Sequence, residues 1–203
     1  MKIKQFNKYE DYLALQYEKT ADPIRREKWI KNLNKNAEIF KNTFLPYNEI
    51  FSYREINFGV CLGARTGEEV LALRHLGVKN CIGVDLVPHT DLVIQADLHN
   101  LPYGDGSINF IYTNVFDHIL KVDCFFKEME RVLPIGGKLF MQLQINNSLD
   151  KYGVLYIDAK GYDFFENFVK EKYSFKKVLE EKPPYKTPHN GALNWNVILE
   201  RSE

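Results

Sequence analysis

Hydrophobic and polar residues follow two different patterns along the chain. Over residues 9–44 the apolar positions recur at helical spacing with a break at Asp22-Pro23, which predicts two helices that form an N-terminal cap. Beyond this region, short apolar runs alternate with longer amphipathic stretches. The apolar runs predict strands over residues 58–62, 80–84, 92–95, 108–112 and 138–145.

The stretches between these runs predict helices. Residues 68–76 and 122–133 each place their apolar side chains on one side of a helix. Residues 161–173 predict a further helix, followed by a closing pair of strands over residues 174–180 and 193–200. Strands that alternate with helices are typical of an α/β fold in which helices cover a parallel sheet.

Composition and charge exclude several classes of protein. The 203 residues are 45% hydrophobic and 27% charged, which predicts one globular domain, with residues 1–50 as the helical cap and 51–203 as the core. Lysine plus arginine (27) equals aspartate plus glutamate (27), so no basic field attracts nucleic acid. The sequence lacks a leader pattern and any run of about 18 apolar residues, so we expect a cytoplasmic protein with no membrane partner. These features leave the oligomeric state open.

The three cysteines, Cys61, Cys81 and Cys124, lack the close spacing of a metal site or a redox motif. Cys61 and Cys81 lie inside apolar runs. We therefore expect buried free thiols and no metal.

Residues 60–70 lead from a predicted buried strand through a glycine-bearing turn into a helix, a geometry that binds cofactors and anions. Gly63 would let the backbone approach a ligand, and Gly67 would let the chain enter the helix tightly. Ala64 and Arg65 lie between them and are expected to border the same ligand. Two glycines alone are weak evidence, because turns need glycine in many proteins.

Two aspartates follow the next two predicted strands. Asp85 falls 22 residues after Gly63, where a carboxylate can accept hydrogen bonds from both hydroxyls of a ribose, although a helix cap or a solvated turn is the alternative. Asp97 comes twelve residues later and could accept from an adenine amino group, with an ordinary loop aspartate as its alternative. Leu86 and Leu98 are placed to sandwich the base.

Two further segments carry a resemblance to a known family. Residues 101–107 read Leu-Pro-Tyr-Gly-Asp-Gly-Ser, and residues 128–137 read Glu-Met-Glu-Arg-Val-Leu-Pro-Ile-Gly-Gly. Together with the turn and the two aspartates, these segments make the chain resemble the class I S-adenosylmethionine-dependent methyltransferases over about residues 58–145. Each motif is loose, but all of them occur in the order found in the family.

The resemblance implies a Rossmann-like, doubly wound sheet of seven mostly parallel strands, with one antiparallel strand near the C-terminus. It implies S-adenosylmethionine as the cofactor and a small molecule as the methyl acceptor. Gly63 and Gly67 would border the methionine and ribose portions, Asp85 would hold the ribose, and Asp97 with Leu98 would hold the adenine. Asn114 would offer its backbone and its amide to the amino group of the cofactor.

The first motif departs from the family at two positions. Cys61 stands where an acidic residue is usual, and Arg65 replaces the central glycine. Arg65 either points into solvent or contacts the carboxylate of the methionine portion. These departures bear on cofactor affinity more than on fold.

His118 is the candidate general base for a hydroxyl acceptor, because imidazole titrates near neutral pH; in the family a histidine here often shapes the pocket instead. The acceptor pocket has further candidate residues, whose alternative roles are packing and solvation: Tyr12, Gln16, Tyr17, Lys19, Tyr185, His189, Asn190 and Trp195. Two other functions stay open. One is a nicotinamide-dependent oxidoreductase, whose glycine spacing differs from that seen here, and the other is a degenerate domain that acts as a non-catalytic partner or regulatory subunit.

Overall fold

The N-terminal region forms two helices, α1 (Tyr9–Ala21) and α2 (Pro23–Phe44), as the sequence pattern predicts. The computed structural model describes residues 2–145, 151–157, 163–183 and 193–203. Asp22 separates the two helices and begins the second, because its carboxylate accepts hydrogen bonds from the amides of Ile24 and Arg25. Pro23 occupies the first turn of α2, where its missing N–H has no intrahelical partner to lose.

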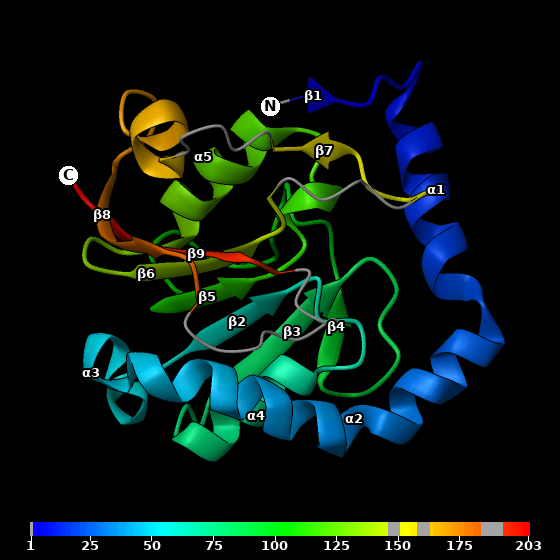
Figure 1. Ribbon diagram of the computed structural model, residues 1–203, viewed down its shortest axis with the longest axis horizontal. Coiled ribbons are helices and arrows are strands. Elements are labelled where there is room, and N and C mark those ends of the chain that lie inside the picture. Colours follow the sequence, from blue (N-terminus) through cyan, green and yellow to red (C-terminus); the bar gives the residue numbers. More distant parts are fainter. Residues whose placement is uncertain (1, 146–150, 158–162, 184–192) are drawn as a thin grey trace.

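A seven-stranded sheet forms the centre of the molecule (Figure 1). In spatial order its strands are β4 (Val93–Gln95), β3 (Cys81–Asp85), β2 (Gly59–Leu62), β5 (Phe110–Thr113), β6 (Lys138–Leu143), β9 (Trp195–Arg201) and β8 (Phe175–Glu181). The first five are parallel, and β9 runs antiparallel to both β6 and β8. This arrangement confirms the expected Rossmann-like sheet with an antiparallel strand near the C-terminus.

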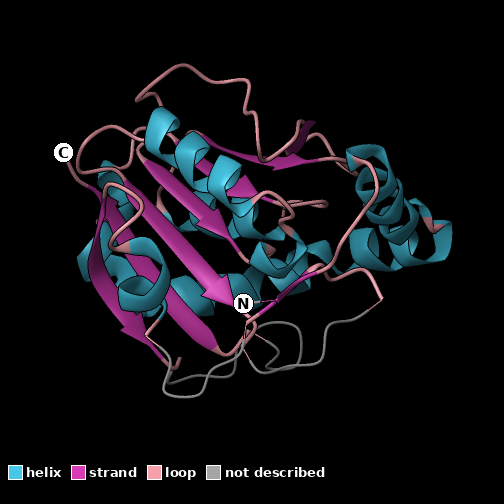
Figure 2. Cartoon of the chain, turned by 90° about the horizontal axis from the view of Figure 1, so that it is seen from above, coloured by secondary structure: helices cyan, strands magenta, loops and turns pink. Residues whose placement is uncertain are grey.

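Helices cover both faces of the sheet. On one side lie α2, α3 (Asn48–Phe51) and α4 (Glu68–Leu76), and on the other lies α5 (Val122–Val132) (Figure 1). Figure 2 shows the molecule from above, with helices (cyan) lying over the strands (magenta). The α5 side is anchored by Phe125, Phe126 and Met129, which are fully buried on the apolar stripe of that helix.

Three details differ from the sequence-based expectation. The predicted helix over 161–173 falls partly outside the described residues, and its described part is a short stretch, Phe165–Val169, with the wider hydrogen-bond register that joins Lys170 N to Phe165 O. A two-stranded sheet pairs β1 (Lys2–Ile3) with β7 (Leu155–Tyr156), and these strands are too short to show an alternating pattern.

The third difference concerns a cysteine. Cys61 and Cys81 are buried free thiols, with their sulfur atoms 3.9 Å apart on neighbouring strands. Cys124 is exposed, so its predicted burial is wrong. It lies on the outer side of α5 beside Asp123, where a small thiol needs no partner.

The position of α1 matters most for the site. This helix does not join either layer and instead runs alongside the carboxyl ends of the parallel strands (Figure 1). In open α/β sheets that edge is where ligands bind. The N-terminal cap therefore has two parts: α2 packs against α4 as part of one layer, and α1 covers the ligand-binding edge.

Candidate functional site

The turn after β2 is shaped by two glycines with positive φ. Gly63 has φ +73°, and its amide donates to the carbonyl of Val84 on the neighbouring strand at 2.7 Å. A Cβ at Gly63 would lie 2.4 Å from a methyl group of Val115, so the close approach that requires glycine is to this side chain. Gly67 has φ +86° and begins α4, where a Cβ would lie 2.7 Å from Cβ of Leu92.

Asp85 ends β3 and holds the same turn in place. Its two carboxylate oxygens accept hydrogen bonds from the amides of Arg65 (3.0 Å) and Val87 (2.9 Å). Burial raises the pKa of this carboxyl, against the lowering effect of those amides. Each oxygen keeps a second lone pair, so the carboxylate can still accept from a ribose hydroxyl.

Asp97 lies beyond β4 and is bound by side chains from two directions. Tyr9 of α1 donates to one carboxylate oxygen at 2.5 Å, and the amide of His99 donates to the other at 2.9 Å. The ring nitrogen Nδ1 of His99 lies 2.7 Å from that second oxygen. Burial alone would raise the pKa of Asp97, but the hydrogen bonds from His99 and Tyr9 outweigh it and hold the pKa at about 2.

A pocket opens between the turn, the ends of β3 and β5, and α1. The space between its walls is about 540 Å³ when the open solvent at its mouth is included. Seven of the predicted site residues line it: Gly63, Arg65, Asp85, Leu86, Asp97, Leu98 and His118. The other three, Ala64, Gly67 and Asn114, lie outside the lining.

Asn114 is not among the residues that line the pocket. Its amide donates to a carboxyl oxygen of Glu69 in the first turn of α4 at 3.1 Å. Glu69 is buried, and burial together with the carboxylate of Glu68 raises its pKa to about 8. The predicted contact between the Asn114 amide and the cofactor would therefore have to compete with Glu69.

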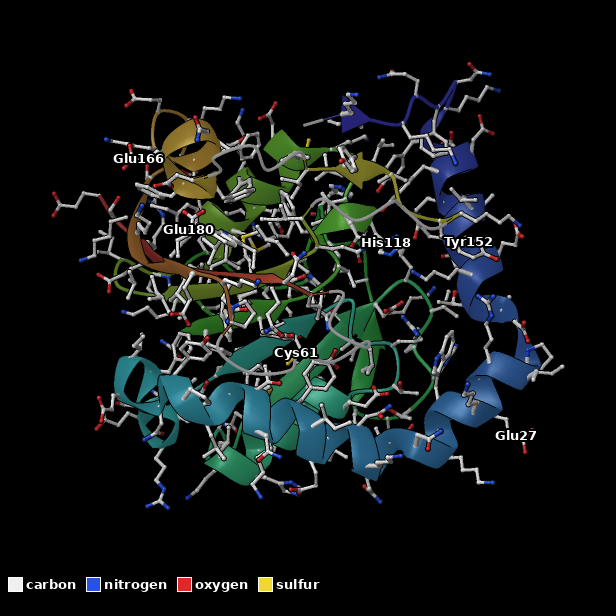
Figure 3. All side chains as sticks on the ribbon, in the orientation of Figure 1. Glu27, Cys61, His118, Tyr152, Glu166 and Glu180 are labelled. Carbon is white, nitrogen blue, oxygen red and sulfur yellow. The ribbon has the colours of Figure 1, made fainter. Side chains whose placement is uncertain are left out.

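His118 lies at the pocket wall beside α1, close to Tyr152 (Figure 3). Its Nδ1 is 3.1 Å from the carbonyl oxygen of Tyr152, and its Nε2 is 2.7 Å from the ammonium of Lys19. Because a carbonyl only accepts and an ammonium only donates, these contacts assign a neutral ring with its proton on Nδ1.

One face of α1 forms the outer wall of the pocket through Tyr12, Gln16, Lys19 and Thr20. These positions follow the helical spacing i, i+4, i+7 and i+8. The first three are among the residues predicted to border an acceptor. Tyr17, also predicted there, is 39% exposed and lies outside the lining, as does Trp195, whose indole donates to Glu180. Tyr185, His189 and Asn190 fall outside the described residues.

Several residues of the site have no counterpart in the sequence-based analysis. Thr20 and Val115 line the pocket. Thr20 could have been predicted, because helical spacing places it on the same face of α1 as Tyr12 and Gln16. Tyr9 reaches Asp97 across 88 residues, a contact without a sequence signal. Trp29 of α2 stacks on the guanidinium of Arg65, with 4.0 Å between Cζ and the ring centre.

The lining fits a nucleoside joined to an amino acid. Asp85 provides an acceptor for ribose hydroxyls, Leu86 and Leu98 provide apolar walls for a base, and Arg65 provides a cation for a carboxylate. Within the described residues, no group of three or more side chains suited to a metal ion occurs. Within the same residues, no helix is both long and apolar enough to span a membrane.

Comparisons with known proteins agree with this geometry. A family model described as a methyltransferase domain matches residues 60–141. A search of curated proteins gave no significant match. The chain is similar in structure to a Burkholderia thailandensis 1,6-didemethyltoxoflavin-N1-methyltransferase with bound S-adenosylhomocysteine, at 11% identity and a TM-score of 0.68 over 98% of this chain and 92% of that one.

Two further structures share the fold. A chain from the complex of the Haloferax volcanii Trm112 methyltransferase activator aligns at 13% identity with a TM-score of 0.60, over 88% of this chain and 98% of that one. The [4+2]-cyclase SpnF aligns at 13% identity with a TM-score of 0.57, over 77% of this chain and 81% of that one. At these identities the likeness shows the fold and leaves the reaction open.

The sheet order and the pocket at its carboxyl edge place the chain in the Rossmann-like class, whose ligands bind at that edge. Within that class, the chain carries a methyltransferase domain of the class I S-adenosylmethionine-dependent type. S-adenosylmethionine is the cofactor of this type.

Proposed function

We propose that the protein transfers a methyl group from S-adenosylmethionine to a small-molecule acceptor. The observation that carries this proposal is the position of α1, whose inner face closes the outer side of the pocket. A wall built into the fold leaves room for a small acceptor and little room for a folded protein or a duplex. The Burkholderia thailandensis relative, named as acting on 1,6-didemethyltoxoflavin, supports the same substrate class.

Methyl transfer from S-adenosylmethionine does not always require a catalytic acid or base. When bound, the cofactor supplies an electrophilic methyl group on a positively charged sulfur, and that charge is neutralised during transfer. The residues contribute by positioning and by excluding water. Asp85 would hold the ribose, Leu86 and Leu98 the base, and the face of α1 would orient the acceptor.

A hydroxyl acceptor would also need a base, and His118 remains the predicted candidate. Its Nε2 already accepts a hydrogen bond from Lys19. His118 could therefore take the proton of an acceptor hydroxyl only after Lys19 moves away, or moves together with the acceptor oxygen. The two contacts of the ring support a role in fastening α1 to the pocket wall. Catalysis by positioning alone is therefore our first expectation, with base catalysis as the prediction to test.

The alternative is a non-catalytic partner or regulatory subunit. Cys61 and Arg65 motivate it, because they stand at positions where the family usually has an acid and a glycine. We further propose that residues 1–203 act as one domain, since α1 and the core share one pocket. The free thiols of Cys61 and Cys81 support a reducing compartment such as the cytoplasm.

Calorimetry with S-adenosylhomocysteine and with a nicotinamide dinucleotide tests the cofactor. We expect the first to bind and Asp85→Ala to abolish binding, whereas Asp91→Ala, an exposed aspartate in the following loop, should leave it unchanged. Binding of the dinucleotide alone would refute the proposal. A metabolite extract incubated with radiolabelled methyl donor then tests turnover, and cofactor binding without any labelled product would favour the non-catalytic alternative.

A further inference from the structure

Arg65 lines the pocket with a guanidinium that has no acidic partner. Its side chain is half-buried, and its Nε is buried without a hydrogen-bond partner among the described residues. Among those residues, its guanidinium forms no hydrogen bond or ion pair either. Arg131 shows the usual situation, because its guanidinium binds Glu128, Asp105 and two backbone carbonyls. Buried polar groups are usually hydrogen-bonded, so the unpartnered Nε marks the guanidinium as a place where a ligand can bind.

The guanidinium is held in place by stacking, while Asp85 and Glu69 attract it without forming an ion pair. Its Cζ lies 4.0 Å from the ring centre of Trp29, and the Trp29 ring stacks in turn on His89 at 5.8 Å and 23°. His89 is tied back to the turn, because its amide donates to the carbonyl of Arg65 at 2.8 Å. Stacking uses the flat face of a guanidinium and leaves the N–H groups at its edge available for a planar anion.

The two nearest acids, Asp85 and Glu69, make no hydrogen bond to the guanidinium: Glu69 binds Asn114 through Oε1, and its Oε2 has no hydrogen-bond partner among the described residues. Asp85 accepts from the backbone amide of Arg65, and a second backbone amide binds its other oxygen. Glu69 has a pKa raised to about 8 by burial, so it is mainly protonated at neutral pH. The backbone of Arg65 also has φ +42°, a conformation that costs a non-glycine residue energy and that occurs preferentially at functional sites.

From these observations we infer that Arg65 binds the carboxylate of the amino-acid portion of S-adenosylmethionine, with Trp29 as the positioning residue that holds its guanidinium. The inference rests on the proposed function. It favours the cofactor over the acceptor as the source of the carboxylate, because Arg65 adjoins Asp85 through its own backbone. Adjacent residues would thus hold the ribose and the amino-acid portion, which are joined through one sulfur atom. The arginine that replaces the family's glycine then has a binding role.

Two ligands that differ by one carboxylate test the inference. S-adenosylhomocysteine carries it, and S-adenosyl-3-thiopropylamine, its decarboxylated form, does not. In calorimetry the wild type should prefer the first. Arg65→Met should weaken S-adenosylhomocysteine by about 10- to 100-fold, as expected for a charge-assisted contact, and change the decarboxylated ligand by less than about threefold. Trp29→Leu should lower the same preference by a smaller factor.

Control variants separate this role from effects on folding. Arg65→Gly removes the side chain while relieving the positive φ, so it should fold well and still lose the preference for the carboxylate. Arg26→Met removes a neighbouring exposed charge of α2 that lies outside the pocket lining, and it should keep the preference. Equal weakening of both ligands in Arg65→Met, or no weakening of either, would overturn the inference. A wild type that binds neither ligand would refute the proposed function itself.

Discussion

The ammonium of Lys19 lies 2.7 Å from Nε2 of His118 and joins α1 to the turn that follows β5. Two other contacts reinforce this junction: the hydroxyl of Tyr12 donates to the carbonyl of His118, and the amide of Gln16 donates to the carbonyl of Tyr152, both at 3.0 Å. The outer wall of the pocket is therefore fastened by three consecutive turns of one helix. Apolar packing adds to these contacts, because Tyr12 belongs to the buried core and Leu13 and Leu15 pack against it.

Replacing Lys19 tests how firmly α1 is held. Lys19→Met removes a charged donor, a change worth about 1–2 kcal/mol, so local opening of α1 should become roughly 5- to 30-fold more frequent. Hydrogen exchange should then be faster in Tyr9–Ala21 and unchanged in Val122–Val132. Lys8→Met, an exposed lysine just before the helix, serves as the control and should leave both rates unchanged. Faster exchange throughout the protein would contradict the local role.

Glu69 predicts how stability depends on pH. Its pKa is about 8 in the folded protein against an ordinary value of 4.5, so the folded state binds the extra proton between these values. Stability should be highest below about pH 4.5 as far as this group is concerned and should fall as pH rises toward 8, by an amount on the order of a few kcal/mol. Asp85, whose pKa is also raised by burial, contributes in the same direction.

Urea unfolding at pH 5 and pH 8.5 measures this dependence. Glu69→Gln keeps an uncharged side chain of the same shape and should flatten it, because glutamine does not ionise. Glu49→Gln, an exposed glutamate of α3, should leave the pH dependence as in the wild type. Equal slopes for wild type and Glu69→Gln would show that Glu69 ionises normally in the folded protein.

The fold was predictable where local chemistry decides the outcome. The Asp22-Pro23 break and the bounds of α4 at Glu68–Leu76 follow from capping and apolar spacing, and the structure has them as predicted. The stretch Phe165–Val169 was not predictable in detail. There the carboxylate of Glu180 accepts from the amides of Phe164 and Phe165, a contact that depends on how distant parts of the chain pack.

The site was predictable in position but not in its contacts. Parallel topology places the residues after each strand at one edge, which is why Gly63, Asp85 and Asp97 line one pocket. Asp97, however, has a partner on a remote helix, Tyr9 of α1, and no spacing rule encodes such a pair. Asn114 lies directly after β5, as the sequence predicts. Its side-chain amide, however, binds Glu69, and this contact was not predicted.

Tyr9 helps His99 to lower the pKa of Asp97 and links Asp97 to α1. Tyr9→Phe removes the hydroxyl that donates to the carboxylate, so the pKa of Asp97 should rise from about 2 toward its ordinary 3.8. A carboxylate with a depressed pKa stabilises the fold above pH 4, and this contribution is lost as pH falls from about 4 to 2. The variant should thus unfold at a higher pH in acid.

Carboxyl chemical shifts recorded by NMR during a pH titration measure this change directly. Tyr17→Phe alters an exposed tyrosine of the same helix and should leave the pKa of Asp97 unchanged. An unchanged pKa in Tyr9→Phe would assign the low value to His99 alone. It would also remove the proposed link between α1 and the residue expected to bind adenine.

Gly63 and Val115 predict a measurable steric coupling. Gly63→Ala carries two penalties: an unfavourable φ of +73°, which costs about 1–2 kcal/mol, and a Cβ placed 2.4 Å from a Val115 methyl, where overpacking adds about 1–3 kcal/mol. Gly136→Ala isolates the first penalty, because that glycine has φ +84° with no atom within 4 Å of its Cβ position.

Urea unfolding of the single and double variants separates the two penalties. Gly63→Ala should lower the unfolding free energy by more than Gly136→Ala does, and Val115→Ala in the Gly63→Ala background should recover part of the difference, since it removes both clashing methyl groups. A double-mutant cycle then gives the coupling between the two positions. Additive effects, with no recovery, would show that the turn moves away from β5 to accept the new methyl group. In that case the backbone at the pocket wall can shift to accommodate a Cβ at Gly63, in spite of the short distance to Val115.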